Sequence, residues 1–253
     1  MLKDVRQKHI VELLTAQGAL SIAELAVRLD ASMMTIRRDL DALEQEGLVK
    51  KMHGGAVLVS GDNGQPSYHE RSAERQEEKS RIGKAAAGLI KPGAVVLFDA
   101  GTTPLAVVGH IPPDLEFTAI TTGLMTAAEL CSSTSAAVIC VGGNIHPSSY
   151  SAINYLAIDM LSRFHADIAF ISTKSVLVPD GLFETQLPLI EVKRKMVSIS
   201  DRAVLLADHS KFTAKAMCLS VPMKDVHTLI TDDKLPADVR ERLAAMGTEL
   251  VVV

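Results

Sequence analysis

Aromatic side chains are scarce in this sequence of 253 residues. Tryptophan is absent, and aromatic residues make up only 4% of the chain, although 47% of its residues are hydrophobic. Any core must therefore be packed mainly from aliphatic side chains. A chain of this length exceeds the usual size of one small domain and is short for three, so we expect two domains.

Cysteine is also rare, which limits disulfide and metal chemistry. Cys131, Cys140 and Cys218 are odd in number, stand in apolar surroundings and lack the paired spacing of zinc ligands. The sequence therefore predicts no metal site, and no motif in it predicts a cofactor. We expect the three thiols to be buried, in a protein of a reducing compartment.

Excess charge and long apolar runs are missing as well. The net charge is -4 and the pI is near 6.1, so the whole chain is not a polycation that coats nucleic acid by charge alone. Residues 1–55 hold eight Lys or Arg and eight Asp or Glu. No apolar stretch approaches the roughly 20 residues that span a bilayer, and no signal-peptide pattern follows Met1. We expect a cytoplasmic protein without a membrane partner.

The strongest local pattern lies in residues 32–56, SMMTIRRDLDALEQEGLVKKMHGGA. Its apolar residues recur at helical spacing, which predicts a helix that begins at Ser32 and ends at Gly47. The opposite face of this helix carries Met34, Arg37, Arg38 and Asp41. Residues 48–53 then approach the pair Gly54 and Gly55, which indicates a short hairpin, or wing, with the cations Lys50 and Lys51.

Two amphipathic helices are predicted ahead of this one. Residues 5–17 have apolar residues on one face and end before Gly18, and Ser21 with Glu24 forms a capping box for a second helix. The tight turn at residues 30–32 fits a helix-turn-helix whose third helix reads the DNA major groove. The alternative is an ordinary solvated basic face. The candidate DNA contacts are Ser32, Met34, Thr35, Arg37, Arg38, Lys50, Lys51 and His53.

A polar stretch rich in Gly, Ser and charge separates this segment from the rest of the chain. We therefore predict a DNA-binding domain over residues 1–58, a linker over 59–80 and a second domain over 81–253. In the second domain, apolar strands alternate with amphipathic helices. This alternation predicts an α/β domain with a largely parallel sheet.

Small polar loops follow several predicted strands, at the edge where such sheets bind ligands. Their glycines allow close backbone approach, and their hydroxyl and charged groups suit a phosphate and sugar hydroxyls. Taken singly, each of these loops has an alternative interpretation as an ordinary connecting turn, and each charged pair as a surface ion pair. The candidate effector-binding residues are Asp99, Gly101, Thr102, Thr103, Thr121, Thr122, Gly142, Gly143, Lys174, Glu191, Lys193, Asp208 and Lys211.

The first part of the chain resembles the amino-terminal domain of DeoR-type bacterial transcriptional regulators. The likeness lies in LLTAQGALSIAELAVRLDASMMTIRRDLDALEQEGLVKKMHGGA, with its TIRRDL helix and HGGA wing end. It implies a winged helix-turn-helix that binds operator DNA. The chain departs from the family pattern at Ala31 and at Met33 and Met34, which stand at the front of the reading helix, so the operator sequence does not follow from the resemblance.

The resemblance continues through DAGTT, VGG, DIAFIS, EVKRKM and ADHSKF. It implies an effector domain similar in fold to ribose-5-phosphate isomerase and CoA transferases, which senses phosphorylated sugars. Tyr68 and Arg71 stand where the family often has an aromatic residue and an arginine. Departures at Thr122, Ser172 and Asn154 bear on which sugar is bound.

Three functions compete at this level. The first is a transcriptional regulator, a repressor by family habit, that acts as a dimer or tetramer on a carbohydrate operon and responds to a sugar phosphate. The second is a sugar-phosphate isomerase with a helical appendage, in which carboxylates and lysines of the second domain transfer a proton. The third is an architectural DNA binder without an effector. We favour the regulator over an enzyme.

Overall fold

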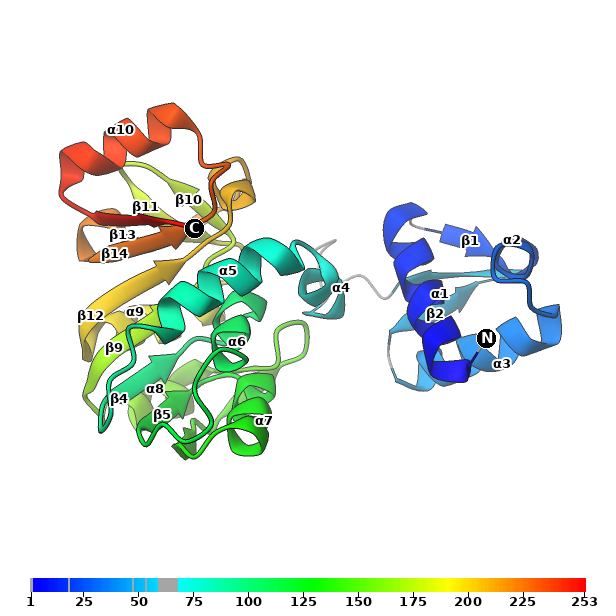
Figure 1. Cartoon of the computed structure of the whole chain (residues 1–253), viewed down its shortest axis with the longest axis horizontal. Helices are drawn as coiled ribbons and strands as arrows, with labels where there is room; N and C mark the ends of the chain where they lie inside the picture. The colour runs from blue at the N-terminus through cyan, green and yellow to red at the C-terminus, as the bar shows by residue number, and fades with distance from the viewer. Residues whose placement is uncertain (1, 18, 47, 53, 59–67) are drawn as a thin grey trace. The chain divides into compact units, whose positions relative to one another are not determined.

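The computed structural model describes residues 2–17, 19–46, 48–52, 54–58 and 68–253. The chain forms two compact units, Met1–Ala73 and Glu74–Val253, which we call the head and the body. Each unit is described by itself. Figure 1 gives the element labels that are used below.

In its described residues, the head contains three helices and a three-stranded antiparallel sheet of order β1-β3-β2, followed by a short helix. The elements are α1 (Lys3–Gln17), β1 (Ala19–Ser21), α2 (Ile22–Arg28), α3 (Met33–Gln45), β2 (Val49–Met52), β3 (Gly55–Leu58) and α4 (Tyr68–Ala73). Helices α2 and α3 with the β2-β3 hairpin make the predicted winged helix-turn-helix. Strand β1, which pairs with β3, was not predicted.

Helical spacing explains the core of the head. Ile36, Leu40 and Leu43 of α3 are buried together with Ile10 and Leu14 of α1, as their intervals of three and four predict. The capping box is confirmed, because the Ser21 hydroxyl accepts from the Glu24 N–H while the Glu24 carboxylate accepts from the Ser21 N–H. The predicted helix ends at Gly18 and Gly47 lie outside the described residues.

The stretch expected as a linker, residues 59–80, contains regular structure. Helix α4 and the first residues of α5 (Gln76–Ala87) fall inside it, and the body begins at Glu74. Residues 59–67 lie outside the described residues. The dense charge of residues 69–80 is compatible with helix because most of these side chains are solvent-exposed, while Tyr68 and Lys79 are buried.

The body is built on a seven-stranded parallel sheet of order β15-β14-β12-β9-β4-β5-β6. All seven strands were predicted. Their bounds are β4 (Val95–Phe98), β5 (Thr118–Thr121), β6 (Ala137–Cys140), β9 (Ala166–Ile171), β12 (Ser200–Leu206), β14 (Thr228–Thr231) and β15 (Glu249–Val252).

Alternate residues of each strand point to opposite faces of the sheet, so there are two apolar layers. Leu97 packs in one layer with Met196, and Phe98 packs in the other with Phe170. Residues of α8 (Asn154–Leu161), α9 (Leu187–Ser198) and α10 (Ala237–Met246) belong to the first layer. Residues of α5, α6 (Thr102–Val108) and α7 (Leu124–Ser133) belong to the second. Figure 1 shows these helices flanking the strands.

Smaller sheets that were not predicted complete the body. A hairpin joins β7 (Asn144–His146) to β8 (Ser151–Ile153), and β10 (Ser175–Leu177), β11 (Gly181–Glu184) and β13 (Cys218–Pro222) form an antiparallel sheet. Two short 3-10 helices, η2 (His209–Phe212) and η3 (Met223–Asp225), follow β12 and β13. None of the helices that the structure describes has the length and hydropathy of a membrane span.

The expectation that the cysteines are buried was wrong for two of the three. Cys131 and Cys140 are exposed, and Cys218 is half-buried. Cys131 lies on the outer face of α7, and Cys140 ends β6, which is an edge strand of the sheet. An apolar sequence neighbourhood does not bury a residue at the edge of a sheet, because no further strand covers it.

Candidate functional site

Helix α3 starts with a side-chain cap that fixes its first turn. The Ser32 hydroxyl accepts a hydrogen bond from the Thr35 N–H at 3.1 Å, and the two hydroxyls lie 2.9 Å apart. Capping of this kind satisfies an N–H group that has no partner within the helix. Ser32 and Thr35, both candidate DNA contacts, therefore hold the end of the helix as well.

The solvent face of α3 presents the cations that the sequence pattern predicted there. Met34, Arg37 and Arg38 are exposed, whereas Ile36 and Leu40 are fully buried on the other side. Within the described part of the chain, neither arginine has an ion-pair partner. Each guanidinium is therefore available to bind an acceptor from outside the protein, such as a base edge or a phosphate.

A buried ion pair sets the position of α3 against α1. Asp39, which is only 2% exposed, accepts two hydrogen bonds from Arg6, at 2.5 Å to Nε and 3.2 Å to Nη2. The hydrogen bond to Asp39 raises the pKa of Arg6. Asp39 directly follows Arg37 and Arg38 in the sequence and faces the core. Its bidentate contact with Arg6 fixes the rotation of α3.

The two lysines of the wing have different surroundings. Lys50 and Lys51 are both exposed on β2. Lys51 forms ion pairs with Asp41 and with Glu44 of α3, the latter at 3.4 Å, and these carboxylates raise its pKa. The Lys51 N–H also donates to Glu44. Lys51 thus joins the wing to α3, whereas Lys50 has no ion-pair partner among the described residues; His53 lies outside them.

In the body, we call the side of the sheet where all its strands end the carboxyl edge. Along the chain, β5 and β6 are added on one side of β4, and β9, β12, β14 and β15 on the other. The order of strands thus reverses between β4 and β9. In open α/β sheets, ligands bind outside the carboxyl ends of the strands at such a switch point.

A buried polar cluster lies at this switch point, and we call Asp99, Ser172, Glu184 and Lys193 the edge cluster. Asp99 follows β4 and accepts from the Ser172 N–H at 3.0 Å, which joins the ends of β4 and β9. The Lys193 ammonium reaches Asp99 at 2.8 Å and Glu184 at 3.0 Å. The sequence placed Asp99 and Lys193 in one site, and the structure brings them together.

The charge of Lys193 follows from these contacts. Burial by itself would lower the pKa of Lys193, but the charges of Asp99 and Glu184 and the hydrogen bonds to them outweigh burial and raise the pKa above its ordinary value. Lys193 therefore stays protonated. One ammonium between two carboxylates leaves a net negative charge, so the edge cluster favours hydroxyl donors over an anion as neighbours.

The loops after β4 and β5 approach their neighbours closely because they contain glycine. A Cβ on Gly101 would stand 2.5 Å from the Ser172 hydroxyl, and one on Gly123 would stand 3.0 Å from the Ala100 Cα. The Thr121 hydroxyl donates to the Phe98 carbonyl and accepts from the Gly123 N–H, both at 3.0 Å. Thr121 therefore holds these loops together rather than standing free.

Three other candidate hydroxyls lie on the same two loops. Thr102 is half-buried at the start of α6, and Thr103 beside it is buried. Thr122 is only 1% exposed, and its hydroxyl has no hydrogen-bond partner in the described part of the chain. A buried hydroxyl without a partner costs free energy unless something binds it.

Glu191 does not join the edge cluster, although it lies two residues from Lys193. It is exposed and pairs with Arg194 at 2.8 Å. Residues two apart in a helix point about 200° away from each other, so when Lys193 faces the sheet, Glu191 must face solvent. Gly142 and Gly143 are exposed after the edge strand β6, and Lys174 is half-buried after β9.

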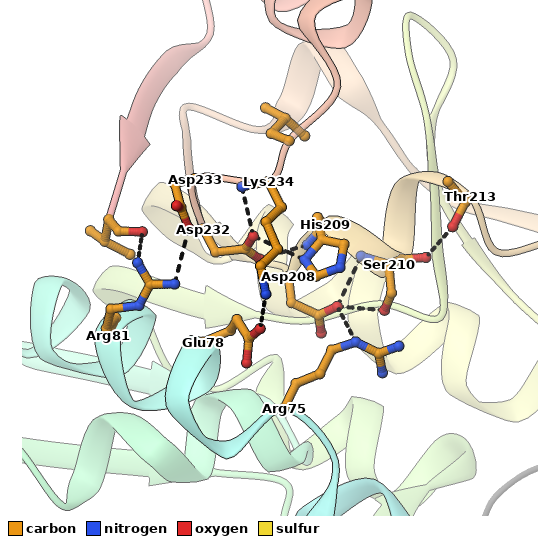
Figure 2. Close-up of polar contacts among 12 residues, drawn as sticks. Arg75, Glu78, Arg81, Asp208, His209, Ser210, Thr213, Asp232, Asp233 and Lys234 are labelled. Atoms are coloured by element: carbon orange, nitrogen blue, oxygen red, sulfur yellow. Dashed lines mark hydrogen bonds and ion pairs between the residues drawn. The ribbon is translucent and has the colours of Figure 1, made fainter.

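A second polar cluster lies on the next two strands of the sheet, at the ends of β12 and β14 (Figure 2). Asp208 caps η2 by accepting from the Ser210 N–H at 3.0 Å, and the Arg75 Nε lies 3.7 Å from its carboxylate. The fully buried Asp232 accepts from the His209 backbone at 2.8 Å and lies 2.9 Å from its ring nitrogen. Lys211 is half-buried on η2.

Three charged residues of these clusters, Glu184, Arg75 and Asp232, were missed from the sequence. Glu184 ends the short strand β11, and a carboxylate closing the apolar run Gly181-Leu182-Phe183 was the available signal. Arg75 lay inside the expected linker, where no site residue was predicted. Among the described residues, no group of His, Cys, Asp and Glu has the arrangement of a metal site.

Comparisons with known proteins agree with both units. Residues 6–61 match the DeoR-like helix-turn-helix domain, and residues 74–233 match the DeoR C terminal sensor domain. The chain is 34% identical to the HTH-type transcriptional regulator GolR of Listeria innocua, covering 91% of each chain. It is 31% identical to the glycerol-3-phosphate regulon repressor of Escherichia coli, covering 94% of each.

A solved structure also matches. The probable sor operon regulator from Shigella flexneri aligns with a TM-score of 0.46 and 13% identity, over 76% of this chain and 94% of that chain. The family matches span most of the sequence, and the exposed arginines of α3 lie within the matched helix-turn-helix segment. The chain belongs to the DeoR family of helix-turn-helix transcriptional regulators.

Proposed function

We propose that this regulator represses a carbohydrate-utilisation operon and that a phosphorylated sugar, bound at the carboxyl edge of the body, modulates the repression. The observation that carries the proposal is the buried Asp99–Lys193–Glu184 arrangement at the switch point of the sheet, in a chain whose head presents exposed arginines on α3. The relatives named as repressors, including that of the glycerol-3-phosphate regulon, support it.

The chemistry of the carboxyl edge suggests how a sugar phosphate would lie. The edge cluster is net negative and offers carboxylate acceptors, so it suits sugar hydroxyls. The phosphate would lie toward the loops after β4 and β5, where Thr102, Thr103 and Thr122 offer hydroxyls and Gly101 brings the backbone close. Gly142, Gly143, Lys174 and Lys211 border the same edge and complete the proposed contacts.

The direct test measures operator binding with and without ligand. Duplexes from upstream of the neighbouring genes would be titrated with the full-length protein by fluorescence anisotropy, and glycerol 3-phosphate, ribose 5-phosphate and fructose 6-phosphate would then be added. We expect tight binding to at least one duplex and a change in its affinity with at least one phosphate. Failure to bind any duplex at low salt would contradict the function.

Thr102→Val is expected to weaken the ligand response. The substitution removes one hydroxyl from the start of α6 without changing the shape of the side chain, and a lost hydrogen bond to a charged group costs about 1.5–3 kcal/mol. The thermal shift that the active sugar phosphate gives should fall accordingly. Thr118→Val, at the amino end of β5, is the matched control and should keep the full shift. An unchanged shift in Thr102→Val would place the phosphate elsewhere.

Lys50→Ala should weaken DNA binding more than Lys51→Ala does. Lys50 has no ion-pair partner among the described residues, whereas Lys51 must leave Asp41 and Glu44 before it can reach a phosphate. We expect Lys50→Ala to weaken specific and non-specific duplexes alike and to reduce the slope of log affinity against log salt by about one. Equal effects of the two substitutions would show that DNA displaces the Lys51 ion pairs.

The protein would act as a dimer or tetramer. A single winged helix-turn-helix buries little DNA surface, and paired heads on two half-sites raise affinity. Sedimentation of the protein with an operator duplex tests this directly. The isomerase alternative predicts steady turnover of pentose or hexose phosphates, which an isomerisation assay on the full-length protein would detect.

A further inference from the structure

Arg75 stands where the chain enters the body. It is the second residue of that unit, two residues after the head ends at Ala73. Its backbone is left-handed, with φ 49 and ψ 45, immediately before α5. Residues other than glycine seldom adopt this conformation, and when they do, the surrounding contacts must hold it.

The contacts that hold Arg75 reach the carboxyl edge of the sheet. Its Nε lies 3.7 Å from the Asp208 carboxylate at the end of β12, and its Nη1 lies 3.1 Å from Glu74. The Asp208 side chain is 1% exposed, whereas that of Arg75 is 37% exposed. Figure 2 shows the Arg75 side chain reaching Asp208 from the cyan ribbon at the start of α5.

Helix α5 is anchored to the same edge, so the backbone that follows Arg75 is held in place. Glu78 pairs with Lys234 at 2.8 Å, and Arg81 pairs with Asp233 at 3.1 Å and donates to the Val253 carbonyl at 2.7 Å. Lys234 and Asp233 both follow β14. Helix α5 is thereby tied to β14, while Arg75 makes an ion pair with the end of β12.

Asp208 can lose Arg75 without being left unsatisfied. Its carboxylate also accepts from the Ser210 N–H and from the Ser210 hydroxyl. Arg75 in turn is solvent-exposed, and its 3.7 Å contact with Asp208 is longer than a hydrogen bond. The Arg75–Asp208 pair is therefore a weak contact that can open, as a switch between two states requires.

We infer that the Arg75–Asp208 pair couples the body to the head, and that effector binding at the carboxyl edge opens this pair. This inference rests on the proposed function and names its regulation. Effector binding would draw Arg75 from Asp208, change the start of α5 and alter the chain segment that leads back to the head. Losing the Arg75–Asp208 pair by mutation should therefore imitate the effector.

The test uses the full-length protein and does not depend on finding the effector. Without ligand, Arg75→Ala should bind the operator duplex at least about fivefold more weakly than wild type, the lower end of typical coupling. Asp208→Asn should shift the affinity in the same direction, and Arg75→Lys, which keeps the charge, should stay close to wild type. Arg81→Ala removes an arginine from the same helix but not from Asp208 and should also stay close to wild type.

The response to ligand gives the second measurement. The ligand is whichever of glycerol 3-phosphate, ribose 5-phosphate and fructose 6-phosphate weakens operator binding by the wild type. For Arg75→Ala, the ratio of operator affinity with this ligand to operator affinity without it should be near one. The thermal unfolding of Arg75→Ala should stay near that of wild type. Wild-type operator affinity in ligand-free Arg75→Ala, or a full response in it, would overturn the inference. If none of the three compounds changes the operator affinity of the wild type, the proposed effectors are wrong. The comparison of operator affinity between Arg75→Ala and wild type without ligand still decides the role of Arg75.

Discussion

Replacing Arg37 and Arg38 together by alanine is expected to lower specific operator affinity by about 30-fold or more, since each arginine that reads a base contributes roughly 1–3 kcal/mol. Both side chains are exposed on α3 and have no ion-pair partner in the described part of the chain. Their removal leaves no buried group unpaired, so the unfolding free energy of the head should change by less than about 0.5 kcal/mol.

Fluorescence anisotropy with an operator duplex and with a scrambled duplex measures this effect. The preference for the operator should shrink with the double substitution, because the lost contacts are to bases. Arg163→Ala, which removes an exposed arginine that pairs with Asp159 in the body, is the control and should leave both affinities unchanged. If the double variant kept its preference for the operator, α3 would not be the reading helix.

The head could be predicted closely because its information is local. Helical intervals gave the buried residues of α3, and the Ser21–Glu24 capping box gave the start of α2. What the pattern did not show was pairing across helices. Asp39 stands among charged residues in the sequence, but it is buried against Arg6, 33 positions away.

The body shows the same division between local and distant information. The seven parallel strands were predicted because each contains an apolar run, as expected for strands of a sheet with helices on both faces. Strands β7, β8, β10, β11 and β13 were missed because each is short and contains a polar residue, so no continuous apolar run marks them in the sequence. Glu184 lies on one of them, so the partner that completes the edge cluster could not be assigned.

Glu191 and Lys193 illustrate how far a motif can be interpreted. Their closeness in the sequence suggested one site, yet a helix turns them to opposite sides, one to Arg194 at the surface and one to the buried edge cluster. Asp99, Ser172, Glu184 and Lys193 come from four separate segments. Only the topology of the sheet brings them together.

Replacing Lys193 by methionine is expected to destabilise the body by about 3–5 kcal/mol, because it leaves Asp99 and Glu184 buried and unpaired. In a unit of this size, such a loss lowers the Tm by roughly 10 °C. Lys195→Met, on the same helix but half-exposed, is the matched control and should change stability by less than about 0.5 kcal/mol. Adding Glu184→Gln to Lys193→Met should restore part of the loss, since one of the two carboxylates is then gone.

The pH dependence of this effect separates charge from packing. The folded state raises the pKa of Lys193, so the contribution of Lys193 to stability is fully present below the unfolded pKa of about 10.5 and is lost as the pH rises through the higher folded pKa. Urea unfolding from neutral to alkaline pH should therefore give a constant difference between wild type and Lys193→Met up to about pH 10.5 and a narrowing difference above it. A difference that does not depend on pH would mean that Lys193 stabilises the switch point by its packed side chain and not by its charge.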